Sequence, residues 1–356
     1  MKTSTDRGVQ SPTRVVLAVL TLVMAAGSAP AHAECGCWRF VRPTGSTLGE
    51  VTAPAANAAW ATGSRGSRPA LLAWNGRQWR DSPLAVPSTT ILEGVSASSR
   101  KNAWVVGFDP WGVALAAHWN GRAWKKVPFP KAGPTFLRAV DSRTTEDTWA
   151  VGSTSGFAGS QAAVWHWNGA AWKTTPARSP LGSELSAVSA VSATQAWAVG
   201  TQGKNPLILR WDGRTWAPSP TPKIEGEATL TDVAGTWAVG TSFAGTEKPL
   251  ALHWDGRAWA VSPVPGTGRL ASVAEDGRGG VWAAGETSDG RATLAHWNGR
   301  FWDLSSAPSP LGEEEETLTG PSSVWGLAHV PGTAALWAVG TARNAAMTWT
   351  NAPRPR

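Results

Sequence analysis

The feature that most constrains this chain is a tryptophan-centred unit that recurs along nearly its whole length. Its first phrase is Trp-Ala-Val-Gly or a close variant, in which Gly follows the Trp by three residues. The seven copies place that Trp at Trp60, Trp104, Trp149, Trp197, Trp237, Trp282 and Trp337. A second phrase, Trp-(Asn/Asp)-Gly-x-x-Trp, opens at Trp74, Trp119, Trp167, Trp211, Trp254 and Trp297. A period of about 45 residues with several short strands per unit is typical of propellers rather than of helical solenoids.

Each unit predicts four strands. The first has a Leu-x-x-Val pattern and the second contains the Trp-Ala-Val phrase, while the third runs into the second phrase and the fourth starts at its closing Trp. The Asn-Gly or Asp-Gly between the third and fourth strands predicts a type I′ hairpin turn, in which both central residues need positive φ. The fifth unit is shorter because the turn before Trp237 is reduced to Ala234-Gly235.

The two ends of the repeat array complement each other. The seventh unit stops after a predicted third strand at 345–349, whereas residues 36–43 look like a fourth strand without its first three. We therefore expect the strand around 38–41 to pair on the outside of the last blade. The predicted fold is an all-β, seven-bladed β-propeller with four-stranded antiparallel blades, whose ring is closed by the N-terminal strand.

The first 33 residues predict a secretory signal peptide. A basic region with Lys2, Arg7 and Arg14 precedes an apolar stretch at 15–26 and a small-residue cleavage site ending at Ala33. No later apolar run approaches the roughly 18 residues of a membrane span. The predicted organisation is a signal peptide at 1–33, a propeller at 34–351 and a C-terminal tail at 352–356. We expect a secreted, extracellular monomer without a membrane span.

The charge distribution argues against a nucleic-acid partner, and the two cysteines leave several pairings open. The net charge is +7, but the Lys and Arg residues are scattered, so we expect no nucleic-acid partner. Cys35 and Cys37 are separated by one residue. A bond between them would close a small, strained loop, whereas bonds to a partner chain and free thiols are the alternatives.

The fourth unit carries a resemblance to known repeats. Ala196-Trp197-Ala198-Val199-Gly200, followed by the 207–216 hairpin and a Pro-rich segment, resembles kelch-like and tectonin-like propeller repeats, and the resemblance covers residues 36–351. Kelch repeats usually carry a Gly-Gly doublet where this chain has one Gly, so the resemblance is to the broad propeller class. Sialidase Asp boxes place Asp two residues before Gly, whereas here Asp255 directly precedes Gly256. Tectonin-like propellers are often lectins, which implies carbohydrate binding, although a fold does not settle function.

Aromatic and histidine content exclude some chemistry. The chain has 24 Trp and no Tyr, so neither a sialidase Tyr nucleophile nor a galactose-oxidase-type copper site can be built. The Trp residues of the two phrases are predicted to form the core, since each buries about 150–250 Å². Four histidines precede the first Trp of a hairpin phrase, at His118, His166, His253 and His296. Equivalent positions lie on different blades, so we expect repeat-consensus residues, with no metal site and no cofactor.

Polar residues of the first strands are candidates for the wall of a central channel. These are Glu50, Glu93, Arg138 and Asp232. A carboxylate pair there could do acid–base work, but no spacing selects a pair, and solvated channel walls are commoner. The run 313–316 of four Glu residues could hold a cation or form a solvated acidic loop. We therefore assign no catalytic residue.

Differences among the copies are a better guide to a binding site. The loops between strands two and three, and those between strand four and the next strand one, open on the same face and vary in content. The candidate ligand-binding residues there are Trp111, Asp109, Phe157 and Phe243. Exposed aromatics beside Asp109, Lys204, Asp289 and Arg291 would stack on a sugar ring or grip a peptide. The alternative is that Trp111 and the Phe residues fold back as loop anchors.

These patterns favour a binding module over an enzyme. The hypothesis is recognition of an extracellular glycan or protein through the face that bears the variable loops. The alternatives are a glycan-active hydrolase or lyase that uses channel carboxylates, and a purely structural surface protein.

Overall fold

The computed structural model of the chain describes residues 1, 38–41, 46–130, 133–306, 322–342 and 345–351. The expected signal peptide, the two cysteines, the run 313–316 and the C-terminal tail lie outside these residues, apart from Met1. The chain divides into two units, Met1–Cys35 and Gly36–Arg356, and the strands of the described residues all lie in the second. Every regular element of the described part is a β-strand, and this part holds no helix that could cross a membrane.

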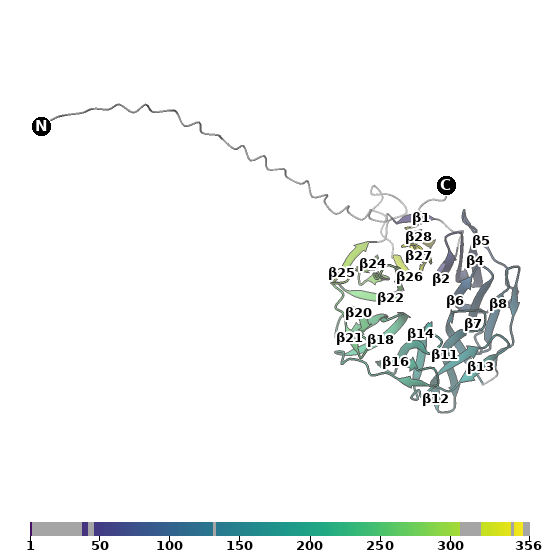
Figure 1. The fold of residues 1–356 in the computed structure, drawn as a ribbon. Coiled ribbons are helices and arrows are strands. Elements are labelled where there is room, and N and C mark those ends of the chain that lie inside the picture. Colours follow the sequence, from purple (N-terminus) through teal and green to yellow (C-terminus); the bar gives the residue numbers. More distant parts are fainter. Residues whose placement is uncertain (2–37, 42–45, 131–132, 307–321, 343–344, 352–356) are drawn as a thin grey trace. The chain divides into compact units, whose positions relative to one another are not determined.

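The strands form seven four-stranded antiparallel sheets, which follow one another around a ring (Figure 1). Blade 1 contains β2 (Thr47–Ala55), β3 (Ala58–Arg65), β4 (Arg68–Trp74) and β5 (Trp79–Asp81). Blade 2 contains β6 (Ile91–Ser99), β7 (Asn102–Phe108), β8 (Ala114–Trp119) and β9 (Trp124–Lys126). Blade 3 contains β10 (Thr135–Ser142), β11 (Thr148–Gly156), β12 (Gly159–Trp167) and β13 (Trp172–Thr175). Blade 4 contains β14 (Ser183–Ser192), β15 (Gln195–Gln202), β16 (Asn205–Trp211) and β17 (Trp216–Pro218).

Blade 5 contains β18 (Glu227–Ala234), β19 (Trp237–Phe243), β20 (Glu247–Trp254) and β21 (Trp259–Val261). Blade 6 contains β22 (Gly268–Glu275), β23 (Val281–Thr287), β24 (Ala292–Trp297) and β25 (Trp302–Ser306). Blade 7 contains β26 (Ser322–His329), β27 (Leu336–Ala342) and β28 (Ala345–Thr350), and its fourth strand is β1 (Arg39–Val41). β1 pairs antiparallel with β28, with Phe40 opposite Trp349, so the predicted sharing of the last blade between the two ends is confirmed.

The core is divided among the seven interfaces between blades. At six of them the Trp of the first phrase packs against both Trp residues of the next blade's hairpin phrase. Trp104, for example, lies 4.9 Å from Trp167 and 5.0 Å from Trp172 between ring centroids. The same arrangement joins the last blade to the first, where Trp337 contacts the hairpin of blade 1. Blade 7 lacks a hairpin phrase, and there Trp38 beside β1 contacts Trp282 at 5.7 Å.

The first strand of every blade carries a β-bulge, which begins one residue after its first-strand Leu or, in blade 7, one residue after Val324. In blade 2 the pairing of β6 with β7 shifts register between Leu92 and Gly94. The same shift occurs in the other six blades. The Gly of the first phrase lies opposite this bulge, and a Cβ atom built on Gly107 would be 2.0 Å from the backbone oxygen of Ile91. The repeated Gly is therefore required by close backbone approach.

The hairpin between the third and fourth strands differs from the prediction. In blade 1 Trp74 pairs with Trp79, so four residues form the loop rather than the two of a type I′ turn. The Asn75 side-chain oxygen accepts the backbone N–H of Arg77 and Gln78, each at 3.0 Å, and Gly76 has a φ of 90°. The Asn or Asp of the phrase thus caps the loop through its side chain.

Candidate functional site

The variable loops share one face of the ring, which we call the loop face. There, in blades 3, 4, 5 and 7, the start of the first strand or the residue before it donates a backbone hydrogen bond to the hairpin between the second and third strands of the preceding blade. These bonds include Thr135 N to Gly112 O (2.8 Å), Gly182 N to Ser160 O (2.8 Å), Ala228 N to Lys204 O (2.9 Å) and Ser322 N to Gly290 O (2.8 Å). The two classes of loop therefore meet on one face.

The three aromatic candidates all lie on the loop face. Trp111 is 72% exposed in the β7–β8 loop, Phe157 is fully exposed at the tip of the β11–β12 hairpin, and Phe243 is 49% exposed at the end of β19. Trp111 and Phe157 do not fold back as loop anchors, so that alternative is wrong for them. They belong to neighbouring blades 2 and 3, whereas Phe243 belongs to blade 5.

Asp109 shapes the loop that presents Trp111. Its Oδ1 atom accepts the backbone N–H groups of Trp111 (3.0 Å) and Val113 (2.8 Å). Gly112 closes the turn with a φ of 77°. Below the loop, the Phe108 and Phe136 rings meet edge to face at 5.1 Å. Asp109 therefore uses one carboxylate oxygen to hold the Trp111 loop.

Two further apolar side chains complete this part of the face. Val113 follows Trp111 in the same loop, and Leu181 bridges to Gln161 beside the Phe157 hairpin. Both are exposed. We call Trp111, Val113, Phe157 and Leu181 the apolar sector. The sequence analysis missed Val113 and Leu181, because a single Val or Leu in a loop carries no signal of exposure.

Backbone hydrogen bonds connect the loops of the apolar sector to one another. In addition to the bonds above, Ser155 N donates to Pro134 O at 3.0 Å and Gly203 N donates to Gly182 O at 3.0 Å. The chain of contacts runs from the Trp111 loop through the start of blade 3 to the Phe157 hairpin and blade 4. The sector is therefore preformed, which lowers the entropy lost when a ligand binds.

Charged groups expected beside the aromatics are engaged with each other. Lys204 forms an ion pair with Glu227, and Arg291 pairs with Asp289 at 3.2 Å. Exposed pairs of this kind add little stability. Because of these ion pairs, the charged side chains of Lys204 and Arg291 already have partners on the loop face.

The first strands enclose a central cavity of about 410 Å³. Glu50, Arg138 and Asp232 line it as expected, whereas Glu93 lies beside it and binds Arg138 at 2.8 Å. Asp232 is not a simply solvated wall residue. One of its oxygens accepts the hydroxyl of Ser272 (2.7 Å) and the N–H of Val273 (2.8 Å), both in blade 6.

Burial controls the ionisation of the channel carboxyls. Each carboxyl remains partly open to the cavity, yet the surrounding protein is dense enough that desolvation is the largest influence on its pKa. Desolvation raises the pKa of Asp232 to about 6, although the hydrogen bonds from Val273 and Ser272 favour the charged form and lower it. Burial, followed by the nearby charge of Asp232, raises the pKa of Glu50 well above its usual range. Burial also raises the pKa of Asp141, a channel residue that the sequence analysis missed.

The polar residues of the first strands link the blades. A side-chain oxygen of one blade accepts a backbone N–H of the next at six interfaces. The bonds are Ala97 N to Thr52 Oγ1, Ser142 N to Ser96 Oγ, Ala190 N to Asp141 Oδ2, Gly235 N to Ser189 Oγ, Val273 N to Asp232 Oδ2 and Leu327 N to Ser272 Oγ. This repetition assigns Asp141 and Asp232 a structural role.

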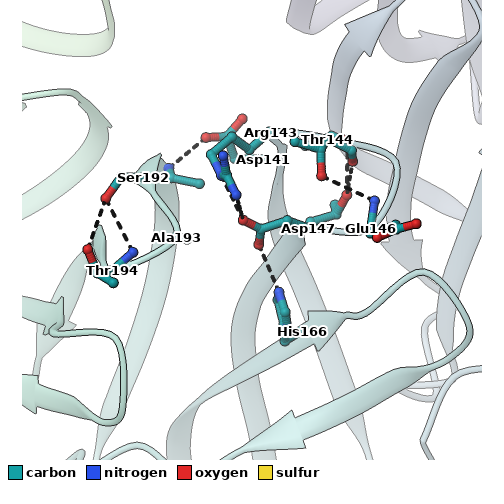
Figure 2. A network of polar contacts seen from close by, with 12 residues as sticks. Asp141, Arg143, Thr144, Glu146, Asp147, His166, Ser192, Ala193 and Thr194 are labelled. Atoms are coloured by element: carbon teal, nitrogen blue, oxygen red, sulfur yellow. Dashed lines mark hydrogen bonds and ion pairs between the residues drawn. The ribbon is translucent and has the colours of Figure 1, made fainter.

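The histidines of the hairpin phrase occupy four different blades, each against its own Trp. The ring centroids of Trp149 and His166 lie 4.2 Å apart. Figure 2 shows Asp147 between His166 and Arg143, at 2.8 Å from His166 Nε2 and 2.7 Å from Arg143 Nε. Within the described ranges no group of three or more His, Cys, Asp or Glu residues is arranged to hold a metal ion.

Comparison with known proteins identifies the fold alone. No protein-family model matches the chain, and no curated protein matches it. A solved structure of "YCF48 bound to D1 peptide" is 15% identical, with 88% of this chain and 96% of that chain covered at a TM-score of 0.60. YCF48 from Cyanidioschyzon merolae is 17% identical, with 88% and 98% covered at a TM-score of 0.59. A fucose-specific lectin from Aleuria aurantia is 12% identical, with 77% and 100% covered at a TM-score of 0.51. The chain therefore has the fold of a seven-bladed β-propeller.

Proposed function

We propose that the chain is a secreted, monomeric binding module that recognises an apolar segment of a protein partner through the apolar sector of the loop face. The observation that carries this proposal is the exposure of Trp111 and Phe157 on neighbouring loops that are held by backbone hydrogen bonds. Exposed aromatic side chains on a rigid surface are the groups that supply most of the energy of protein recognition.

The chemistry of the sector favours a protein over a glycan. A sugar site needs several free polar groups around its aromatic ring, because each sugar hydroxyl must regain its hydrogen bonds. The other exposed side chains of the sector, Val113 and Leu181, are aliphatic, and Asp109 Oδ1 is occupied by its own loop.

One structural comparison supports this proposal. A propeller of similar fold has been solved with a peptide bound, as the description of that structure states. At 15% identity this only makes peptide binding by such a fold reasonable for our chain. A kelch-like or tectonin-like relationship remains a proposal on the repeat pattern alone.

The proposal is tested by panning a random peptide library against residues 34–356. We expect enrichment of peptides with apolar or aromatic residues. The double variant Trp111→Ala/Phe157→Ala should bind the enriched peptides at least about tenfold more weakly, which corresponds to about 1.4 kcal/mol.

The matched control is Val191→Ala, which removes an exposed apolar side chain from the turn end of β14, away from the loop face. This variant should bind the peptides as the unchanged chain does. The absence of any enriched peptide, or equal binding by the double variant, would contradict the proposal.

A further inference from the structure

A second cavity, of about 460 Å³, lies on the loop face where blades 7, 1 and 2 meet. Its walls come from the start of β2, the β3–β4 turn, the start of β6, and blade 7. It belongs neither to the apolar sector nor to the central channel. Its volume is in the range of small-molecule sites, which are about 300–1,000 Å³.

Trp325 is the aromatic group of this cavity. It occupies the bulge position of β26, one residue after Val324. The equivalent residues of the other blades are Gly49, Glu93, Arg138, Ser186, Thr231 and Ala271. Trp325 is also outside both repeated phrases, so the packing that explains the other blades' Trp residues does not explain it.

The Trp325 ring is held in place from one side. The Arg269 guanidinium lies 5.0 Å from the ring centroid, and its Nη2 is 2.6 Å from Glu286 Oε1. Glu286 also accepts a hydrogen bond from the Ser323 hydroxyl. Since these contacts fix the cation, they also fix the ring that lines the cavity.

The remaining walls are rich in hydroxyl groups. The hydroxyl side chains that line the cavity are Thr47, Ser64, Ser67, Thr89, Thr90 and Thr341. Thr47 and Ser64 are hydrogen-bonded to each other at 2.7 Å. Hydroxyls both donate and accept, so they match the hydroxyls of a sugar ring, whose apolar face stacks on an aromatic side chain.

Of the described residues that line the cavity, Arg68 is the charged one. It is exposed at the first position of β4, and within the described part of the chain it has no ion-pair partner. Among the described residues of the lining, none is a carboxylate that would repel an anion. A planar guanidinium recognises a carboxylate through two parallel hydrogen bonds.

We propose that this cavity binds an acidic saccharide, with a sugar ring stacked on Trp325 and its carboxylate bound by Arg68. The site goes beyond the proposed protein recognition, because it lies on other blades and uses other residues. The bulge of β26 places the ring, and the β3–β4 hairpin supplies the cation and the hydroxyls of Ser64 and Ser67.

The proposal is tested by titrating the chain with oligosaccharides that contain uronic or sialic acid, and with their neutral counterparts. We expect binding of acidic members that weakens as NaCl is raised, because salt screens the Arg68 charge. Trp325→Ala should weaken it about tenfold or more, and Trp325→Phe should retain part of it. Arg68→Gln should remove the preference for acidic over neutral sugars.

Trp111→Ala is the control for specificity and should leave saccharide binding unchanged. Each variant is checked for an unchanged melting temperature, and Arg68→Gln alters only an exposed side chain. No binding by the unchanged chain would overturn the proposal. Saccharide binding by Trp325→Ala that equals binding by the unchanged chain would also overturn it, and so would an Arg68→Gln variant that keeps the preference for acidic sugars. A site that binds peptides in a Trp325-dependent way but binds no saccharide would likewise overturn it.

Discussion

Glu50 compensates for a gap in the hydrogen bonds that link the first strands. Val273 N and Leu327 N each bond to a side-chain oxygen of the preceding blade. The corresponding donor in blade 1 is Val51 N, but the residue that would face it from blade 7 is Gly326, which has no side chain. Glu50 Oε1 accepts Val51 N itself at 3.0 Å. A carboxyl is thereby placed in the channel for a task that needs only an acceptor.

Replacing Glu50 by Gln should therefore stabilise the protein at alkaline pH. Because burial raises the pKa of Glu50 in the folded state, the folded chain binds that proton more tightly than the unfolded chain. Its stabilising contribution is complete below the unfolded pKa of about 4.3 and is lost as pH rises through the folded pKa. The Gln variant keeps the acceptor and has no charge to bury. We expect a gain of about 1 kcal/mol, or about 2 °C in Tm, at pH 8.

The gain should shrink towards zero near pH 4, and the measurement is thermal unfolding of both proteins from pH 4 to pH 8. Burial lowers the pKa of His118 and of His253, which destabilises both proteins equally as the pH falls, so the difference isolates Glu50. Glu146→Gln, at an exposed site, is the control. A gain that is independent of pH would contradict the burial argument.

At the scale of strands, the bulge of the first strand and the Gly of the second strand depend on each other. The bulge moves the first-strand backbone towards the second strand, where only a residue without a Cβ atom fits. All seven first-phrase glycines would place a Cβ within 2.0 Å of a backbone oxygen of the first strand. This explains why Gly appears in each copy although the residue before it varies between Ala, Val and Thr.

Gly107→Ala should destabilise the protein more than an ordinary strand substitution. The added Cβ would meet Ile91 O at 2.0 Å, so the backbone of β6 or β7 must shift. Overpacking of this kind costs about 1–3 kcal/mol. Gly156→Ala in β11 is the matched control, because nothing lies within 4 Å of its Cβ position. Urea unfolding of both variants measures the effect, and equal midpoints would show that the bulge does not require Gly.

For the whole molecule, the repeat contained enough information to predict the fold. Thirteen phrase positions and the complementary ends predicted the blade number, the strand order and the pairing of the 38–41 strand with the last blade, because every blade is built from the same repeated packing contacts. The hairpin geometry was missed, since Asn75 caps a longer loop with its side chain. The candidate sites were only partly accessible to sequence reasoning.

Two physical reasons explain what the sequence could not show. The cavity at Trp325 needs walls from three blades, and no local pattern reports which loops meet there. The exposure of Leu181 depends on its neighbours in blade 3. Trp111 and Phe157 were predictable because they are aromatic residues that the repeat does not require.

The central claim, that blades 2 to 4 present a protein-binding surface, is tested most directly by hydrogen–deuterium exchange with and without a peptide selected by panning. Bound peptide slows exchange where it covers or rigidifies the backbone. The account predicts slowed exchange at 109–113, 157–160 and 179–183, with none in the turn between β14 and β15. Slowed exchange confined to that opposite turn, or to the outer strands β21 and β25, would contradict it.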